Sequence, residues 1–477
     1  MKKSYTDSFF DVGSKFGFLP NNHPLTSLPN RYNSLQRLLD NMPVKLSDGS
    51  NGYLAIPNKI ENEVERLPNY IDLVKKESEI LIIQALYRAY CFLTSAYTLE
   101  LSYQEFVKTK KYGKARQILP KQVAQPFVCV AEKLDVYPWL DYHYAYSLGN
   151  YRFLDKSKGF HWSNLDQCVK FSGTSDESGF IMNHVDINQH SPKLVKSVLE
   201  SLKAVKNDDQ EKLNENLKQN FHSMVFVNER RKDMWVASRW KHYNDFRIFI
   251  MGIKGNNEIF DDGLVYQGVW DEPKQYRGQT GAQDNIIPME DIFSGVINFY
   301  PDNQLTKYLL DLRKYRPKCI QNFFVDLKQD IDSIHGGSIF NFLKSSQNSV
   351  GMCYLLAIVE EIYKFRNGHW QFVQKYIMSN TKYAKATGGT PIISWIPNQI
   401  KSVLNFIDVI LHELQSMDKD FDNKQNEFFI NSLNTYKSKR KLLDKQLIVV
   451  SDANYNPGKV FELNKKFKLE DSNFEKK

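Results

Sequence analysis

The chain has 477 residues, of which 42% are hydrophobic and 25% are charged, so it can bury a large core and is neither fibrous nor disordered. Its five cysteines are scattered without a Cys-x-x-Cys pair, which argues against a disulfide framework or a structural zinc site and favours a reducing, cytoplasmic compartment. The net charge is +8, and residues 437–477 carry eleven Lys and Arg against six Asp and Glu. A basic end of this kind can bind nucleic acid or acidic membranes, but it is more often a solvated terminus.

Helical periodicity of apolar residues recurs along the chain, whereas strand-like alternation is scarce. The most apolar stretch, from Ile80 to Leu101, is interrupted by Gln84 and Arg88, so we expect a buried helix and no membrane span there. Ser191 followed by Pro192 is typical of a helix N-cap and first turn. The predicted helices cover about 71–101, 192–205, 210–226, 304–312, 350–377 and 400–417, and a further helical stretch ends near 447.

Clusters of proline and glycine interrupt this pattern and indicate where domains begin and end. The stretch from Asp155 to Gly173 indicates one such boundary. We therefore predict an all-α protein with a small N-terminal helical domain (1–165) and a larger helical domain (166–400). Residues 401–477 are predicted to form a helical C-terminal extension with a polar, basic end. This extension could either pack on the body of the protein or mediate oligomer formation, and the sequence leaves both alternatives open.

One histidine of the predicted helix 350–377 lies on its apolar stripe. This residue, His369, shares helical spacing with Leu355, Val359, Ile362, Val373 and Tyr376. An imidazole on a buried face needs partners for its ring nitrogens, so it is either a satisfied core residue or a ligand. Nearby, residues 386–390 read Ala-Thr-Gly-Gly-Thr, and these glycines would let the backbone approach a bound molecule closely.

Several motifs follow one another in a fixed order. They are FGFLP at 16–20, LPKQVAQP at 119–126, HYNDFR at 242–247, DGLVYQGVW at 262–270, YRGQTGAQD at 276–284 and FRNGHWQFVQKYI at 365–377. With these motifs the chain, from about Phe16 to Pro397, resembles the indoleamine 2,3-dioxygenase family, whose members are haem enzymes that open the indole ring of tryptophan. The ordered set is far more specific than any single motif, and it favours a haem ligand over a core residue for His369.

The resemblance implies a haem b held by His369 as the proximal iron ligand, which a neutral imidazole suits. In the family, an Arg three residues before this His pairs with an Asp on the helix after the Gly-Ala-Gln segment. Arg366 and Asp291 occupy these positions, although two separate exposed charges are the alternative. Thr280 and Gly281 match residues of the distal loop over the haem, where Ser-Ala or Gly-Ala is common in the family.

The resemblance also implies a substrate site. Arg247 matches the arginine that binds the substrate carboxylate, for which a guanidinium is geometrically suited, although it could instead be one of several surface arginines. Phe180 and Tyr243 match aromatic walls of the pocket. Thr387 matches a threonine near the amino and carboxylate groups of the substrate, and Tyr142 is expected to help form the pocket.

His184 lies one helical turn after Phe180, where mammalian-type members of the family have Ser and bacterial-type relatives have His. Its imidazole could accept a hydrogen bond from the indole N–H or donate one to bound oxygen, so we expect it to modulate catalysis. Asn188 replaces an acidic residue of many relatives, and His242 falls where some members carry a second aromatic residue. Because of His242, the distal pocket is expected to be more polar than in those relatives, whereas the effect of Asn188 stays open.

The function implied by the resemblance is insertion of O2 across the indole C2–C3 bond of L-tryptophan to give N-formyl-L-kynurenine, the first step of the kynurenine pathway. Two alternatives stay open: a haem oxygenase for another indole or amine, suggested by His184, His242, Asn188 and Gln279, and a non-catalytic haem-binding sensor that uses the C-terminal extension as a partner surface. A nucleic-acid binder would need a recognition motif that the chain lacks. We expect no nucleic-acid or membrane partner, and the sequence leaves the oligomeric state open.

Overall fold

Helices dominate the computed structural model, which describes residues 5–378, 385–389 and 392–452. Within these ranges the named strands form two sheets of two strands each, so the all-α fold class is confirmed. β1 (Ile118–Leu119) pairs in parallel with β4 (Val265–Tyr266), and β2 (Tyr151–Phe153) pairs antiparallel with β3 (Leu165–Gln167). Strands of two or three residues cannot form a core layer, and the helices therefore build the core.

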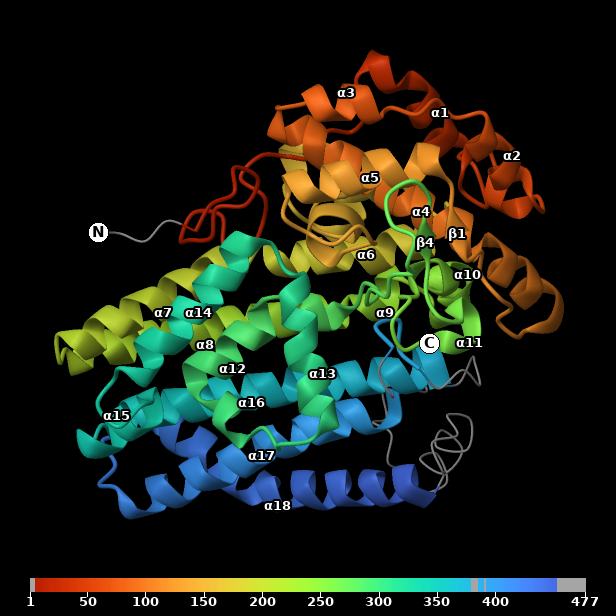
Figure 1. Ribbon diagram of the computed structural model, residues 1–477. Coiled ribbons are helices and arrows are strands. Elements are labelled where there is room, and N and C mark those ends of the chain that lie inside the picture. The colour runs from red at the N-terminus through yellow and green to blue at the C-terminus, as the bar shows by residue number, and fades with distance from the viewer. Residues whose placement is uncertain (1–4, 379–384, 390–391, 453–477) are drawn as a thin grey trace.

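The N-terminal helices gather around one long buried helix, α4 (Figure 1). Gln84 and Arg88, the polar residues that interrupt its apolar stretch, both donate hydrogen bonds to the carbonyl oxygen of Gly149, at 2.8 and 2.7 Å. By length and composition α4 could cross a membrane, but 89% of its most apolar window is buried inside the protein, so it is the core helix expected from the sequence. The helices of this part are α1 (Asn33–Asn41), α2 (Lys59–Glu65), α3 (Ile71–Lys76), α4 (Ile80–Thr109) and α5 (Lys121–Lys133).

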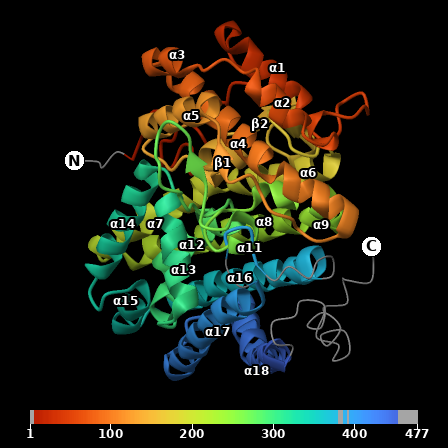
Figure 2. The ribbon, with the colours of Figure 1, turned by 45° about the vertical axis from the view of Figure 1, so that its right-hand side comes forward.

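The longer helices of the remaining chain pack one against the next in the order α7, α8, α16, α17 and α18 (Figures 1 and 2). α16 lies inside this stack, because α8, α12 and α17 all pack against it. The bounds are α6 (Ser175–Asn188), α7 (Ser191–Lys206), α8 (Gln210–Lys232), α9 (Met234–Ala237), α10 (Asn244–Arg247), α11 (Asn257–Phe260), α12 (Ile286–Ser294), α13 (Gln304–Leu312), α14 (Lys318–Asp332), α15 (Ile339–Ser345), α16 (Ser349–Phe372), α17 (Ile392–Ser416) and α18 (Asn423–Asp452).

Local hydrogen bonds explain where the observed helices differ from the predicted ones. Ser191 is already inside α7, and its hydroxyl donates to the carbonyl of Asn188 and accepts from the N–H of Phe18 instead of capping the helix. This hydroxyl ties the closely following α7 to the end of α6 and to the N-terminal segment. The predicted helix 350–377 is α16, which continues into the π-helical turn η11 (Val373–Met378).

The C-terminal helices pack on the body through specific contacts. Lys439 on α18 forms an ion pair at 2.6 Å with Glu360, a buried residue of α16, and Arg440 donates a hydrogen bond at 2.6 Å to Asn405 on α17. α17 passes through the predicted boundary at residue 400. The polar end predicted beyond α18 lies outside the described residues, and the three-part division of the chain stays a prediction.

Candidate functional site

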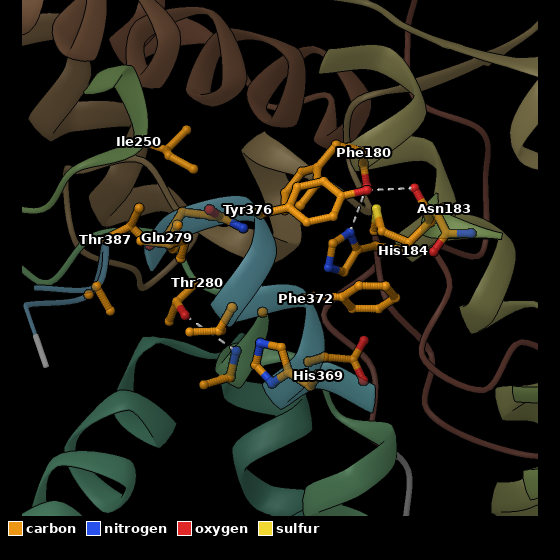
Figure 3. A pocket seen from close by; sticks show the side chains of 18 of the residues that line it. Phe180, Asn183, His184, Ile250, Gln279, Thr280, His369, Phe372, Tyr376 and Thr387 are labelled. Carbon is orange, nitrogen blue, oxygen red and sulfur yellow. Dashed lines mark hydrogen bonds between the residues drawn. The ribbon is translucent and has the colours of Figure 1, made fainter. Parts of the chain in front are cut away.

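A large cavity opens among α6, α8, α16 and the loops around residues 280 and 387, as the close-up in Figure 3 shows. The space within it, part of which is open to solvent, is about 1370 Å³. A smaller cavity of about 620 Å³ adjoins it and shares residues with it. The predicted site residues that line the larger cavity are Phe180, His184, Tyr243, Thr280, Gly281, His369 and Thr387, and those lining the smaller one are Gly281, Asp291, Arg366 and His369.

His369, on the last turns of α16, lines both cavities (Figure 3). Burial, with smaller contributions from His184 and Arg231, lowers the pKa of its imidazole to about 4, so the ring is neutral near pH 7. Neutral imidazole is the form that binds a metal. Within the described ranges no group is hydrogen-bonded to either ring nitrogen of His369. The structure therefore favours a ligand-binding imidazole over a satisfied core histidine.

The predicted ion pair between Arg366 and Asp291 is confirmed at 2.6 Å, inside the wall of the smaller cavity. Tyr300 completes the cluster, because its hydroxyl donates to the same carboxylate oxygen and accepts from Arg366 at 3.0 Å. Burial disfavours the charge on Arg366, but Asp291 and Tyr300 outweigh it and raise the pKa of the guanidinium. The pair joins α16 to α12 one helical turn from His369 and so fixes the position of the imidazole.

Aromatic rings form one wall of the larger cavity. The ring of Phe180 lies 5.1 Å from that of Tyr243 and 5.3 Å from that of His184, measured between centroids. Tyr243 in turn contacts Tyr376, whose hydroxyl donates to the carbonyl of Met234 at 3.0 Å. Burial raises the pKa of Tyr243 to about 12, so this wall is uncharged near pH 7. A flat aromatic molecule can therefore pack here without displacing a charge.

His184 presents one defined nitrogen to the cavity. Its Nδ1 lies 3.0 Å from the carbonyl oxygen of Phe180, and because that oxygen can only accept, Nδ1 carries the proton. Nε2 is then a hydrogen-bond acceptor, and a Cβ built on Gly281 would lie 3.6 Å from it, so it faces the distal loop. Burial lowers the pKa of His184 and keeps the ring neutral.

A carboxylate that the sequence analysis missed, Asp284, lines both cavities beside His184. It accepts hydrogen bonds from the Tyr142 hydroxyl at 2.8 Å and from the Asn188 amide at 2.7 Å. Tyr142 is thus placed behind the cavity wall and reaches the site through Asp284. The contact also explains Asn188, because an acidic residue at that position would face a second carboxylate.

Besides Tyr142, two more residues that the sequence analysis singled out, Arg247 and His242, lie away from the cavity surface. Arg247 is fully buried and donates to the Tyr112 hydroxyl at 2.8 Å and to the backbone carbonyl of Lys385 at 2.7 Å, so its contact with a substrate carboxylate stays a prediction. The side chain of His242 is 41% exposed, and its Nδ1 lies 3.0 Å from a carboxylate oxygen of Asp245. The polarity expected from His242 is therefore absent from the cavity wall, and Asp284 supplies a polar group there instead.

Hydrogen bonds of Thr387 hold the loop around residue 387 against Gln279 and against Gly252. The Thr387 hydroxyl donates to the carbonyl of Gln279 at 2.7 Å, and the Thr387 carbonyl accepts from the N–H of Gly252 at 2.8 Å. A Cβ on Gly278 would lie 2.4 Å from the same carbonyl, so a glycine is required there. Thr280 caps the short helix that follows it, which positions Gly281 at the cavity; Thr390 lies outside the described residues.

The residues at the site fit a haem. The walls are largely apolar and aromatic, and the cavities have room for a large flat group beside a small molecule. His369 would hold the iron, and its neighbours Phe365, Phe372 and Val373, which line the same cavity, would pack on the macrocycle. Arg366 and Asp291 line the adjoining cavity as a neutralised pair, so the fit rests on the apolar and aromatic walls and on the imidazole of His369.

Comparison with known proteins supports this assignment. Residues 6–427 match the model of the family described as Indoleamine 2,3-dioxygenase, so the match begins ten residues earlier and ends thirty residues later than the sequence motifs indicated. The chain is 24% identical to Indoleamine 2,3-dioxygenase 1 of Rattus norvegicus, over 81% of this chain and 92% of the relative. It is 25% identical to Indoleamine 2,3-dioxygenase 2 of Homo sapiens, over 80% and 86%, and 22% identical to the 6-hydroxytryptophan 2,3-dioxygenase of Fusarium equiseti, over 77% and 84%.

The buried ion pair gives a prediction for stability. Arg366→Met leaves the carboxylate of Asp291 buried without its cation, which should lower the free energy of unfolding by about 3–5 kcal/mol in a urea titration. Lys328→Met, which breaks the exposed pair with Asp332, is the matched control and should cost under about 1 kcal/mol. Equal losses in the two variants would contradict the structural importance of the Arg366–Asp291 pair.

Proposed function

Because the chain belongs to the indoleamine 2,3-dioxygenase family and is a haem-dependent dioxygenase, we propose that it converts L-tryptophan and O2 into N-formyl-L-kynurenine. One observation carries the proposal: the same cavity is lined by an aromatic wall, by His184 on α6, whose Nε2 can accept a hydrogen bond, and by His369. An indole offers a flat ring and one N–H donor, which are the two features that this wall can bind.

The protein supplies binding and orientation. Haem bound through His369 would supply the activation of O2 for addition to the indole C2–C3 bond. Phe180 and Tyr243 would hold the plane of the indole, and His184 would accept a hydrogen bond from its N–H, which fixes the rotation of the ring within that plane. Such fixed orientation of two reactants is a large source of rate acceleration.

The carboxylate of the substrate is proposed to bind Arg247, with Thr387 beside it. In the structure one amino group of the Arg247 guanidinium donates to the carbonyl of Lys385, two residues before Thr387. A carboxylate that takes over this donor would release the carbonyl of Lys385. Substrate binding and the position of segment 385–389 would therefore be coupled.

A second candidate substrate is a ring-hydroxylated tryptophan. The similar enzyme of Fusarium equiseti is named for 6-hydroxytryptophan, and the cavity of this chain contains the carboxylate of Asp284, which can accept a hydrogen bond from a ring hydroxyl. Tyr142 and Asn188 hold that carboxylate in place.

A cytoplasmic location is proposed on the basis of the cysteines, all five of which are unpaired thiols.

Turnover with identification of the product tests the function directly. The haem-loaded protein, reduced with ascorbate and methylene blue under ¹⁸O2, should convert L-tryptophan into a product whose mass equals tryptophan plus both labelled oxygen atoms. Preferential turnover of 6-hydroxytryptophan would favour the second candidate. Haem loading without turnover of either indole would contradict both proposals.

The role of His184 predicts a selective loss of affinity. His184→Leu removes one hydrogen-bond acceptor, worth about 0.5–1.5 kcal/mol, so the Kd for L-tryptophan should rise up to about tenfold. The Kd for 1-methyltryptophan, which lacks the indole N–H, should stay equal or fall when it is measured by the same haem difference spectra. His242→Leu, at the exposed histidine, is the control and should change neither value. Equal weakening of both ligands would contradict the hydrogen bond.

A further inference from the structure

A second buried arginine, Arg231 on α8, lines the larger cavity beside α16 and is 8% exposed. Its guanidinium lies directly against Gly368, the residue before His369. A Cβ built on Gly368 would lie 1.9 Å from one terminal nitrogen and 2.2 Å from the central carbon of that guanidinium. A glycine at position 368 is therefore what allows this cation to approach the helix turn that carries His369.

The charge on Arg231 has no direct counter-ion in the described parts of the chain. Its Nε donates to the Oδ1 of Asn228 at 3.2 Å, and the amide of Asn228 donates to Glu361 at 2.8 Å. Glu361 itself forms its ion pair with Lys364, at 2.5 Å. Arg231 thus differs from Arg366, whose charge is compensated by Asp291. The guanidinium therefore places a cation on the haem side of α16, and the carboxylate that attracts it, Glu361, acts on it without a direct ion pair.

The surroundings preserve this charge and limit its screening. The rings of Phe365 and Phe372 lie 5.9 and 5.5 Å from the guanidinium, in positions that allow cation–π attraction. Burial lowers the pKa of Arg231 to about 10, so the group stays protonated near pH 7. Water is largely excluded around it, and a charge in such a medium acts more strongly on its neighbours than an exposed charge does.

We propose that Arg231 tunes the reduction potential of the haem bound at His369 and favours the ferrous state. Reduction adds one electron from an external donor and lowers the positive charge of the iron centre by one, so a fixed cation nearby stabilises the reduced form. Arg231 changes the equilibrium of this step and takes no part in electron transfer. The inference rests on the proposed role of His369 as the iron ligand.

The test is the midpoint potential of the full-length, haem-loaded protein, measured by spectroelectrochemistry. In Arg231→Met the ratio of ferrous to ferric haem at a fixed potential should fall at least tenfold, a shift of about 59 mV to lower potential. Arg231→Lys, which keeps a cation, should retain most of the wild-type potential. Arg230→Met is the matched control. It removes an equal charge from the preceding residue of α8, an arginine that pairs with Asp233 and does not line the cavity.

A second route moves the charge without removing it. In Gly368→Ala the new methyl group would displace the guanidinium, so the potential should also fall, and this effect should vanish when Arg231→Met is already present. The inference is overturned if Arg231→Met shifts the potential no more than Arg230→Met does, or if the Gly368→Ala shift persists in the double variant. A wild-type protein whose haem lacks histidine ligation would instead contradict the assignment of His369, which distinguishes the two failures.

Discussion

The site depends on the way in which one helix, α16, keeps polar groups inside an apolar core. Burying a polar group without a partner costs free energy, and along this helix that cost is reduced in a different way for each group. Arg366 is compensated by Asp291 and Tyr300, His369 stays neutral because burial lowers its pKa, and Gly368 leaves space for the guanidinium of Arg231. Arg366, Gly368 and His369 lie within four residues, so the proposed iron ligand, its structural anchor and the nearby charge are positioned by about one turn of the same helix.

The other walls of the cavity follow a similar principle with neutral groups. The carbonyl of Phe180 fixes the tautomer of His184, and the hydrogen bonds from Tyr142 and Asn188 fix the carboxylate of Asp284. A substrate would therefore meet groups whose positions are already set, which lowers the entropy lost on binding. Arg247 is the exception among the proposed groups, because its guanidinium is engaged with Tyr112 and Lys385.

Much of the fold and part of the site could be predicted from the sequence. Apolar periodicity is a local signal, and it located α7, α8, α13, α16 and α17, with the 304–312 helix matching α13 at both ends. The predicted helix 71–101 is in fact two helices, α3 and α4, because the chain becomes extended at Glu77, and α14 was missed. Motif order located His369, Arg366 and Asp291. The ion pair between Arg366 and Asp291 depends on the contact between α16 and α12, and its two residues were predicted from the resemblance to the family. Arg231 and Asp284 escaped prediction, because their importance comes from contacts with Gly368 and Tyr142 that are distant in sequence. Arg247 was found by its motif, but the motif carried no information about the hydrogen bonds that keep it behind the wall.

The central claim is that His369 is the ligand of the haem iron, and resonance Raman spectroscopy of the ferrous protein tests it most directly. The account predicts an iron–histidine stretching band in the wild-type protein, its loss in His369→Gly, and its return as an iron–imidazole band when free imidazole is added to that variant. An unchanged iron–histidine band in His369→Gly would show that another residue holds the iron, and it would contradict the account.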